Sequence, residues 1–495
     1  MPLRLPVPRI LSRVPLAGNY PAAVIMVLLA LSPYLILTTA TSFALPVLMH
    51  DLSATRFELQ LTSGMSNAGY AFGAVGAADL LQRLPRRVVY LLAESGFVLG
   101  SVLALSAPGI GLFMAGLILQ GLCTGMLLVS ALPPLILGHG IERLPFTAAV
   151  ISIGLFGMVT AGPLVGGLIG SYGGWRLLYT SVAVLAAVGL TLGALTFESN
   201  EPYARGTRFD WLAIPLAFGT AFLPFFGVSW LSRGSFSDAA FLAPVIVGLL
   251  IGAVLIVGQY HKKNALMPVR PISNTLPVSG TLGAMLVGAA FTTLLELAEV
   301  YLEEVARYSP IKSGALIAPM VLGVVIASVL FKQLVTTRWT PVLALSGIVS
   351  VAVGAGILLA VSASNASAVV PVAMLFLGFG AGAGVTPGLF LAGFSVSAAQ
   401  LGPTFALVEL LRSEAAFLIG PVLVHLAMTT GSDFADGYRT SVVVTLILTV
   451  VGGLVVIGIW LAGGSRPKRP DLAAWASGTS TAFHSPAIGA RFRKA

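Results

Sequence analysis

The succession of long apolar runs constrains the fold of this 495-residue chain more than any other feature. Each run has roughly 20–25 residues, the length that an α-helix needs to cross the hydrocarbon core of a bilayer. The runs lie near 22–45, 58–80, 88–106, 109–132, 145–169, 175–197, 211–231, 240–259, 276–301, 313–333, 341–361, 369–394, 404–428 and 440–463. Only 9% of the residues are charged, whereas about 25% are charged in a soluble globular protein. The sequence therefore predicts an all-α, polytopic membrane protein with 14 transmembrane helices.

The apolar runs fall into groups of six, two and six. The first six occupy residues 22–200, the inserted pair occupies 201–265, and the last six occupy 266–463. Gly162-Pro163 lies in the fifth run of the first six, and Gly420-Pro421 lies in the fifth run of the last six. This repeat predicts two pseudosymmetric six-helix halves, with a substrate site between them near the midplane of the bilayer.

The basic residues favour one orientation in the membrane. Of the 27 Lys and Arg residues, 20 fall in the tails or in the loops on the same side, and six fall in the loops on the other side. Because basic residues are enriched in cytoplasmic loops, both termini are expected in the cytoplasm, with the chain in the inner membrane. The tails are 1–21 and 464–495. The second tail, which is rich in Ser, Pro, Gly and basic residues, is expected to be disordered or to lie on anionic lipid.

A glycine-rich stretch in the fifth run has the composition of a tightly packed membrane helix. Gly162, Gly166 and Gly170 recur every fourth residue, so a neighbouring helix can approach this face closely. Pro163 removes a backbone donor and bends the helix. The run Ala161-Gly162-Pro163-Leu-Val-Gly166-Gly167, followed by Gly174-Trp175-Arg176, resembles the antiporter motif of major facilitator exporters, most closely that of fourteen-span drug:proton antiporters. The resemblance implies the major facilitator fold and a gating role for Gly162, Pro163, Gly166 and Gly167.

The loop between the second and third runs resembles the cytoplasmic loop motif of the same superfamily. Arg83, Arg86 and Arg87 match its basic positions, whereas Gln82 stands where the family has an aspartate. Two more positions depart from the fourteen-span family. Leu37 replaces an acid and Leu117 replaces an arginine, both of which are associated with proton coupling and the response to cationic substrates in relatives. The resemblance therefore implies the fold and leaves the coupling open.

Ionisable residues inside the apolar runs are candidates for function, because lipid disfavours a charge that is neither paired nor exposed to water. Glu409 and Arg412 are three residues apart and can meet on one helix face, whereas Glu414 points elsewhere. This pair either holds helices together or opens on protonation or substrate binding. Glu296, near the outer end of its run, could take up a proton or attract a cationic substrate. Glu94 could do the same or reach the basic loop on the inner side.

Uncharged polar residues give a weaker indication of a substrate cavity. Thr39, Ser42 and Gln120 lie within apolar runs and could line a central cavity, or they could bond to their own helix backbones. The five His residues have no metal-ligand spacing, the single Cys excludes a cysteine metal cluster, and no nucleotide-binding loop is present in the sequence. No metal, no cofactor and no nucleic-acid partner are expected.

These features together predict a transporter rather than an enzyme. We expect an exporter of lipophilic small molecules that works by alternating access, with protons as the coupling ion, the lipid bilayer as its environment and a monomeric state. Two other interpretations stay open within the same fold: a lipid or natural-product exporter, and a facilitator without proton coupling. A multispan membrane enzyme acting on lipid-linked substrates would need a convergent acid–base or metal cluster at one membrane face, and the sequence shows none.

Overall fold

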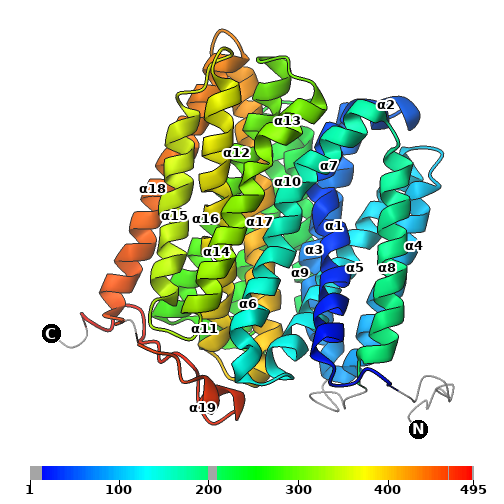
Figure 1. Cartoon of the computed structure of the whole chain (residues 1–495). Helices are drawn as coiled ribbons and strands as arrows, with labels where there is room; N and C mark the ends of the chain where they lie inside the picture. The colour runs from blue at the N-terminus through cyan, green and yellow to red at the C-terminus, as the bar shows by residue number, and fades with distance from the viewer. Residues whose placement is uncertain (1–13, 199–208, 467, 493–495) are drawn as a thin grey trace.

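The computed structural model describes residues 14–198, 209–466 and 468–492 (Figure 1). Parts of the predicted tails, 1–13 and 493–495, and the first part of the predicted insertion, 201–208, lie outside these residues. Within the described part, helices run side by side along one axis, and the only extended pairing is an isolated bridge between Asn274 and Ala487. We call the end of the bundle at which the described residues begin, at residue 14, and end, at residue 492, the terminal face.

Twelve helices within the described ranges are long and apolar enough to cross a membrane. Two more helices of 28 and 29 residues, α3 (Arg56–Arg83) and α17 (Leu401–Thr429), lie in the same bundle but are not among these twelve, and both carry several charged residues. The count of 14 spans therefore stays a prediction.

The long helices form two groups and an intervening pair. The first group is α1 (Tyr20–Phe43), α3, α4 (Arg86–Leu105), α5 (Ile110–Leu137), α6 (Leu144–Ser152), α7 (Met158–Tyr172) and α8 (Trp175–Thr196), with the π-helical turn η3 (Ile153–Gly157) joining α6 to α7. The pair is α9 (Ala213–Trp230) and α10 (Ala239–His261). The second group is α12 (Thr275–Glu304), α13 (Pro310–Ile317), α14 (Pro319–Leu334), α15 (Thr340–Leu358), α16 (Ala366–Phe394), α17 and α18 (Phe434–Gly463). Short helices in the connections are α2 (Leu45–Asp51), η2 (Ile141–Arg143), α11 (Val269–Ile272), η4 (Ala398–Gln400) and α19 (Leu472–Ala476).

The two groups repeat one pattern of helix neighbours. In the first group α1 packs on α5, α7 and α8, and in the second group α12 packs on α16, α17 and α18. The contacts α3–α5, α4–α5 and α4–α8 recur as α14–α16, α15–α16 and α15–α18. Even the Gly-Pro steps correspond, because Gly162 of α7 faces α1 and Gly420 of α17 faces α12. The same set of neighbours therefore occurs in both groups, whereas the division into two pseudosymmetric six-helix halves stays a prediction.

Glycines in α7 allow close packing on two sides. A Cβ atom added at Gly162, Gly166 or Gly170 would clash with the backbone of α1 or with a side chain on it. A Cβ atom at Gly167, on the other side of α7, would clash with the backbone of Pro310 in α13. The predicted glycine face therefore packs on α1, and its neighbour Gly167 packs across the boundary between the two groups.

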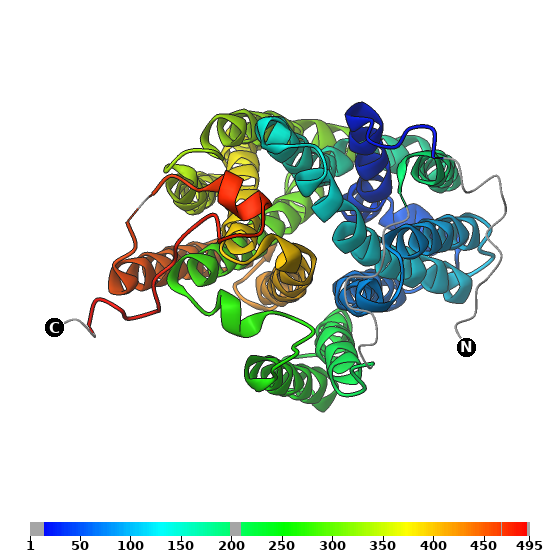
Figure 2. The same cartoon turned by 90° about the horizontal axis from the view of Figure 1, so that it is seen from below.

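The α9–α10 pair lies beside the bundle rather than within it. α9 packs on α3 and α17, one helix from each group, whereas α10 packs mainly on α9 (Figure 2). α10 presents Leu, Ile and Val side chains outward, as expected for a helix that faces lipid. The pair thus extends the surface at the boundary between the groups.

The described part of the C-terminal tail is ordered, which corrects the expectation of disorder. Residues 468–492 contain the short helix α19 and run along the terminal face (Figure 2). Leu472, Trp475 and Phe483 are buried there. The expectation of disorder was wrong because it weighed the polar composition of the tail and missed these apolar side chains, of which Trp475 and Phe483 pack against Phe394 at the end of α16. The alternative, that the tail lies on anionic lipid, stays a prediction.

The glycine packing predicts a stability difference between two Gly→Ala substitutions. We expect Gly166→Ala to lower stability by about 1–3 kcal/mol, because α1 must move to accept the methyl group. Gly76→Ala in α3 is the matched control, since an added Cβ there meets no atom within 4 Å. Thermal unfolding of the purified protein in detergent measures both variants. Equal unfolding temperatures for the two would contradict the close approach of α7 to α1.

Candidate functional site

A buried polar contact joins the two groups of helices at α17. Glu409 is 2% exposed, and its Oε2 atom accepts hydrogen bonds from two nitrogens of Arg412 at 3.0 and 2.5 Å. The same oxygen accepts a hydrogen bond from the hydroxyl of Tyr70 at 3.1 Å. Tyr70 belongs to α3, so one carboxylate oxygen is bonded from both groups.

Tyr70 is held in place by a second tyrosine. The ring of Tyr34 in α1 stacks on the ring of Tyr70, with centroids 5.7 Å apart and planes 10° apart. The Tyr34 hydroxyl lies 3.1 Å from Oγ of Ser66 and donates to Oδ1 of Asn67 at 3.1 Å. Ring stacking between Tyr34 and Tyr70, followed by the hydrogen bond from Tyr70, therefore connects α1 to the carboxylate of Glu409.

The ion pair confirms that Glu409 and Arg412 share a helix face, as their spacing predicted. Both residues are buried, so neither charge is compensated by water. Taking a charge out of water costs several kcal/mol, which the partner charge and further hydrogen bonds must offset. Protonation of Glu409 would remove the negative charge and leave Arg412 buried without a counter-ion. The contact between the two groups therefore depends on the charge of Glu409.

Glu296 lies apart from this pair, on α12 beside Gly420 of α17. One turn further along α12, Glu299 is buried next to Ser42 of α1, and its Oε1 atom has no hydrogen-bond partner among the described residues. The hydroxyl of Ser42 donates to the carbonyl of Thr39 at 2.8 Å. The structure thus places the predicted cavity residue Ser42 next to an acid on the facing group.

The remaining candidates lie inside the first group. Glu94 of α4 is fully buried beside Gly189 of α8, and within the described chain neither of its carboxylate oxygens has a hydrogen-bond partner. Gln120 donates to the hydroxyl of Ser101 at 2.8 Å, and Thr39 donates to a carbonyl of α7 at 2.7 Å. None of these three is brought to Glu409. Thr39 and Gln120 bond to neighbouring helices.

The basic loop motif forms contacts of its own at the terminal face. Arg83 pairs with Asp79 one turn earlier in α3 and lies over the ring of Phe209. Arg87 donates to the carbonyl of Ala194 near the end of α8 at 2.8 Å. Arg86 begins α4, and Gln82 is half-buried near the end of α3. Asp79, three residues before Gln82, thus supplies the carboxylate that pairs with Arg83.

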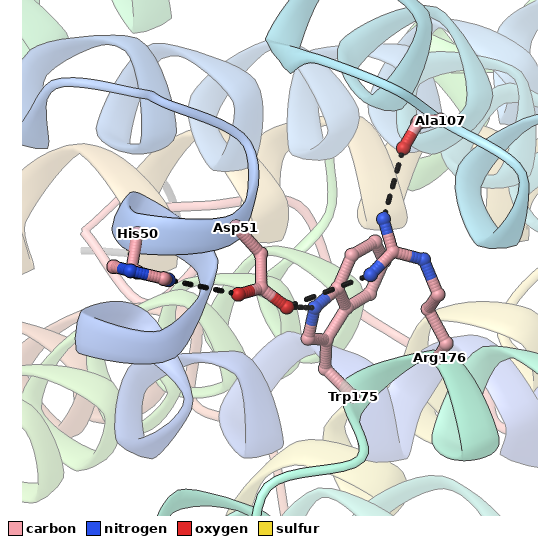
Figure 3. A network of polar contacts seen from close by, with 5 residues as sticks. All are labelled: His50, Asp51, Ala107, Trp175 and Arg176. Carbon is pink, nitrogen blue, oxygen red and sulfur yellow. Dashed lines mark hydrogen bonds and ion pairs between the residues drawn. The ribbon is translucent and has the colours of Figure 1, made fainter.

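On the face opposite the chain ends, a polar clasp involves the Gly-Trp-Arg motif (Figure 3). The indole N–H of Trp175 donates to Oδ2 of Asp51 at 2.8 Å, and Arg176 lies 3.5 Å from the same oxygen. Arg176 also donates to the carbonyl of Ala107 at 3.3 Å, and His50 contacts the other oxygen of Asp51 at 3.1 Å. Hydrogen bonds from His50 and Trp175 hold the pKa of the Asp51 carboxyl below its usual value. The clasp ties the start of α8 to the end of α2 and to the α4–α5 connection.

Sequence reasoning did not identify Tyr34 or Tyr70, which the structure places at the contact with Glu409. A tyrosine in an apolar run gives no sign of its partner, and Tyr70 lies 339 residues before Glu409 in the chain. One available signal was the polar step Ser66-Asn67, one turn before Tyr70 in α3, since such residues are unusual on a face that contacts lipid.

The sequence profile of the Major Facilitator Superfamily matches residues 27–421. The chain belongs to the Major Facilitator Superfamily. A multidrug resistance protein B homolog of Mycobacterium tuberculosis is 30% identical over 305 residues, 61% of this chain and 54% of that protein. The tetracenomycin C resistance and export protein of Streptomyces glaucescens is 24% identical over 311 residues, 61% of this chain and 56% of that protein. The chain spans about half the length of these curated relatives.

A solved structure supports the assignment of the major facilitator fold. The human organic anion transporter MFSD10 (TETRAN) covers 88% of this chain and 99% of its own, with a TM-score of 0.61 and 14% sequence identity. Together with the family match, this confirms an all-helical, multi-pass membrane protein of the major facilitator fold. The names of the relatives and of this structure are those of resistance, export and transport proteins, as expected of a transporter rather than an enzyme.

The buried pair predicts that substitutions at Glu409 and Arg412 change the stability non-additively. Arg412→Leu leaves Glu409 as a buried, unpaired charge, so we expect a loss of about 3–5 kcal/mol, whereas Glu409→Leu with Arg412→Leu loses far less. Thermal unfolding in detergent compares the single and double variants. Glu304→Leu, which removes one partner of an exposed pair with Arg307, is the control and should cost at most about 1 kcal/mol. Additive effects of the two α17 substitutions would argue against the pair.

The clasp predicts a pH-dependent contribution to stability. Because the pKa of Asp51 is lower in the folded protein, its stabilisation is present above the unfolded carboxyl value and is lost as the pH falls through the folded value. The wild-type unfolding temperature should decrease as the pH falls below about 4, the usual range of this carboxyl group. We expect this decrease to be smaller in the Asp51→Asn variant. Identical pH profiles for the variant and the wild type would contradict the role of the clasp.

Proposed function

We propose that this chain is a secondary transporter that exports lipophilic small molecules by alternating access, with proton antiport as the driving reaction. The observation that carries the proposal is the carboxylate of Glu409, which is bonded at once by Arg412 of its own helix and by Tyr70 of the other group. The names of the relatives support export, since one is a multidrug resistance protein homolog and another is an export protein.

In this mechanism, the charged form of Glu409 holds the two groups together at α3 and α17. A proton on Glu409 weakens its bonds to Arg412 and Tyr70, because a neutral carboxyl group is a weaker acceptor than a carboxylate. The groups can then separate, and Arg412 becomes free to contact a substrate or water. Release of the proton restores the contact. In this mechanism, protonation of Glu409 and contact of Arg412 with a substrate both depend on the same rearrangement of α17.

We propose 14 spans in all, counting α3 and α17 with the 12 more apolar helices. Both have the length to cross a bilayer and lie among the other spans, where neighbouring helices cover their polar residues. The proposed units are the halves 22–200 and 266–463, with 201–265 as the inserted pair. The distribution of Lys and Arg supports a cytoplasmic terminal face, and hence an inner-membrane protein with both ends inside. We propose that it acts as a monomer, with each site formed by one chain.

An uncoupled facilitator is the second candidate, and a specific observation favours it. Leu37 and Leu117 occupy positions that are charged in fourteen-span antiporters, and both are buried among apolar residues. If these two positions were required for coupling, the chain would move its substrate down a gradient without protons. The two candidates differ in their response to an imposed pH gradient.

Transport by reconstituted protein tests the two candidates. We expect a panel of lipophilic dyes to leave proteoliposomes faster when a pH gradient is imposed, and Glu409→Gln to abolish the effect of the gradient. Glu304→Gln is the matched control, since Glu304 is an exposed acid at the end of α12. Efflux that ignores both the gradient and Glu409→Gln would favour the uncoupled facilitator, and no efflux of any dye would argue against a lipophilic substrate.

A further inference from the structure

The C-terminal segment 471–487, which we call the strap, is anchored to the second group of helices at the terminal face. The indole N–H of Trp475 donates to the carbonyl of Val396, just beyond the end of α16, at 2.9 Å. The ring of Trp475 packs edge-on against Phe394, with centroids 4.7 Å apart, and is 2% exposed. A tryptophan buried to this extent, with its only polar atom bonded, holds the strap in one position.

Backbone hydrogen bonds add to this anchor at two helix ends. The amides of Ala482 and Phe483 both donate to the carbonyl of Phe394, at 2.9 and 3.1 Å. At the start of α12, the amide of Thr275 donates to the carbonyl of Pro486 at 3.0 Å, and the amide of Leu276 donates to Oγ of Ser485 at 2.8 Å. Helix ends leave such groups without intrahelical partners, so the strap acts as a cap for α16 and α12 together.

The strap also reaches the first group of helices. Its helix α19 lies against η2, the short turn that leads into α6 (Figure 2). On the same face, Gly402 of α17 lies against Val129 and Pro133 of α5. The contact of α19 with η2 and the contact of Gly402 with α5 both cross the boundary between the groups at this face. Any opening of the terminal face must break them.

We propose that the strap is a latch, which keeps the terminal face closed while Trp475 is seated and must move before this face can open. The strap is bonded to α12 and α16 of the second group and also contacts η2 of the first group. It therefore links the two groups at the terminal face. The proposal rests on alternating access, since it assigns the latch to one of the two faces that must open in turn. It explains why a polar tail keeps Leu472, Trp475 and Phe483 buried against the helix ends.

Labelling of single cysteines on the two faces tests the latch. In a Cys123→Ser background, Val129→Cys reports on the terminal face, because Val129 is fully buried at the α5–α17 contact. Ser171→Cys reports on the opposite face, where the Ser171 hydroxyl accepts a hydrogen bond from the amide of Ile311 at 3.1 Å. The probe is a membrane-impermeant maleimide, added from one side and then from the other. We expect Trp475→Ala to raise the labelling rate of Val129→Cys by about tenfold, within the usual range of coupling between two sites.

Two further substitutions separate the latch from a general loss of stability. Ser485→Ala removes one acceptor for α12 and should raise the rate in the same direction as Trp475→Ala, by a smaller factor. Ser480→Ala, on an exposed part of the strap, should leave the rate unchanged. An unchanged rate at Val129→Cys in Trp475→Ala protein, or an equal rise on both faces, would overturn the proposal. Increased labelling of Val129→Cys without dye efflux would support the latch and count against the proposed export.

Discussion

Helices in lipid gain little from burying apolar side chains, because the surrounding lipid is equally apolar, and they associate instead through close packing and polar contacts. The whole arrangement of this protein depends on that constraint. α7 approaches α1 through Gly162, Gly166 and Gly170, and it approaches α13 of the other group through Gly167. The same proximity lets Thr39 of α1 donate to the backbone of α7. α7 therefore makes close backbone contact both with α1 of its own group and with α13 of the other group.

The contact between Tyr70, Glu409 and Arg412 is the polar counterpart of this packing. It joins α3 and α17, the two long helices whose polar residues set them apart from the 12 more apolar ones. A helix that carries buried charges must keep them against other helices, and α17 does so by packing between α3 and α12. In α17, two of the charged residues that set the helix apart, Glu409 and Arg412, are also the residues that form the contact with the other group.

The same boundary is crossed at three levels of the bundle. Gly167 meets α13 toward the face opposite the chain ends, Glu409 meets Tyr70 inside the bundle, and α19 meets η2 at the terminal face. Each contact is of a different kind: backbone packing, charge and hydrogen bonding, and a peptide segment seated on helix ends. In an alternating-access transporter, they would have to break and form in a fixed order, which makes their differing chemistry useful.

The sequence by itself determined the helical class and the meeting of Glu409 with Arg412, because these follow from run length and i,i+3 spacing. It also predicted the glycine face of α7, because glycines at every fourth position can be read directly from the sequence. Only the tertiary structure decided that Tyr70 completes the Glu409 site, that Asp79 pairs with Arg83, and that Trp475 anchors the tail. The Tyr70 and Trp475 contacts join residues 339 and 79 positions apart, and composition cannot reveal which polar group a buried side chain will meet.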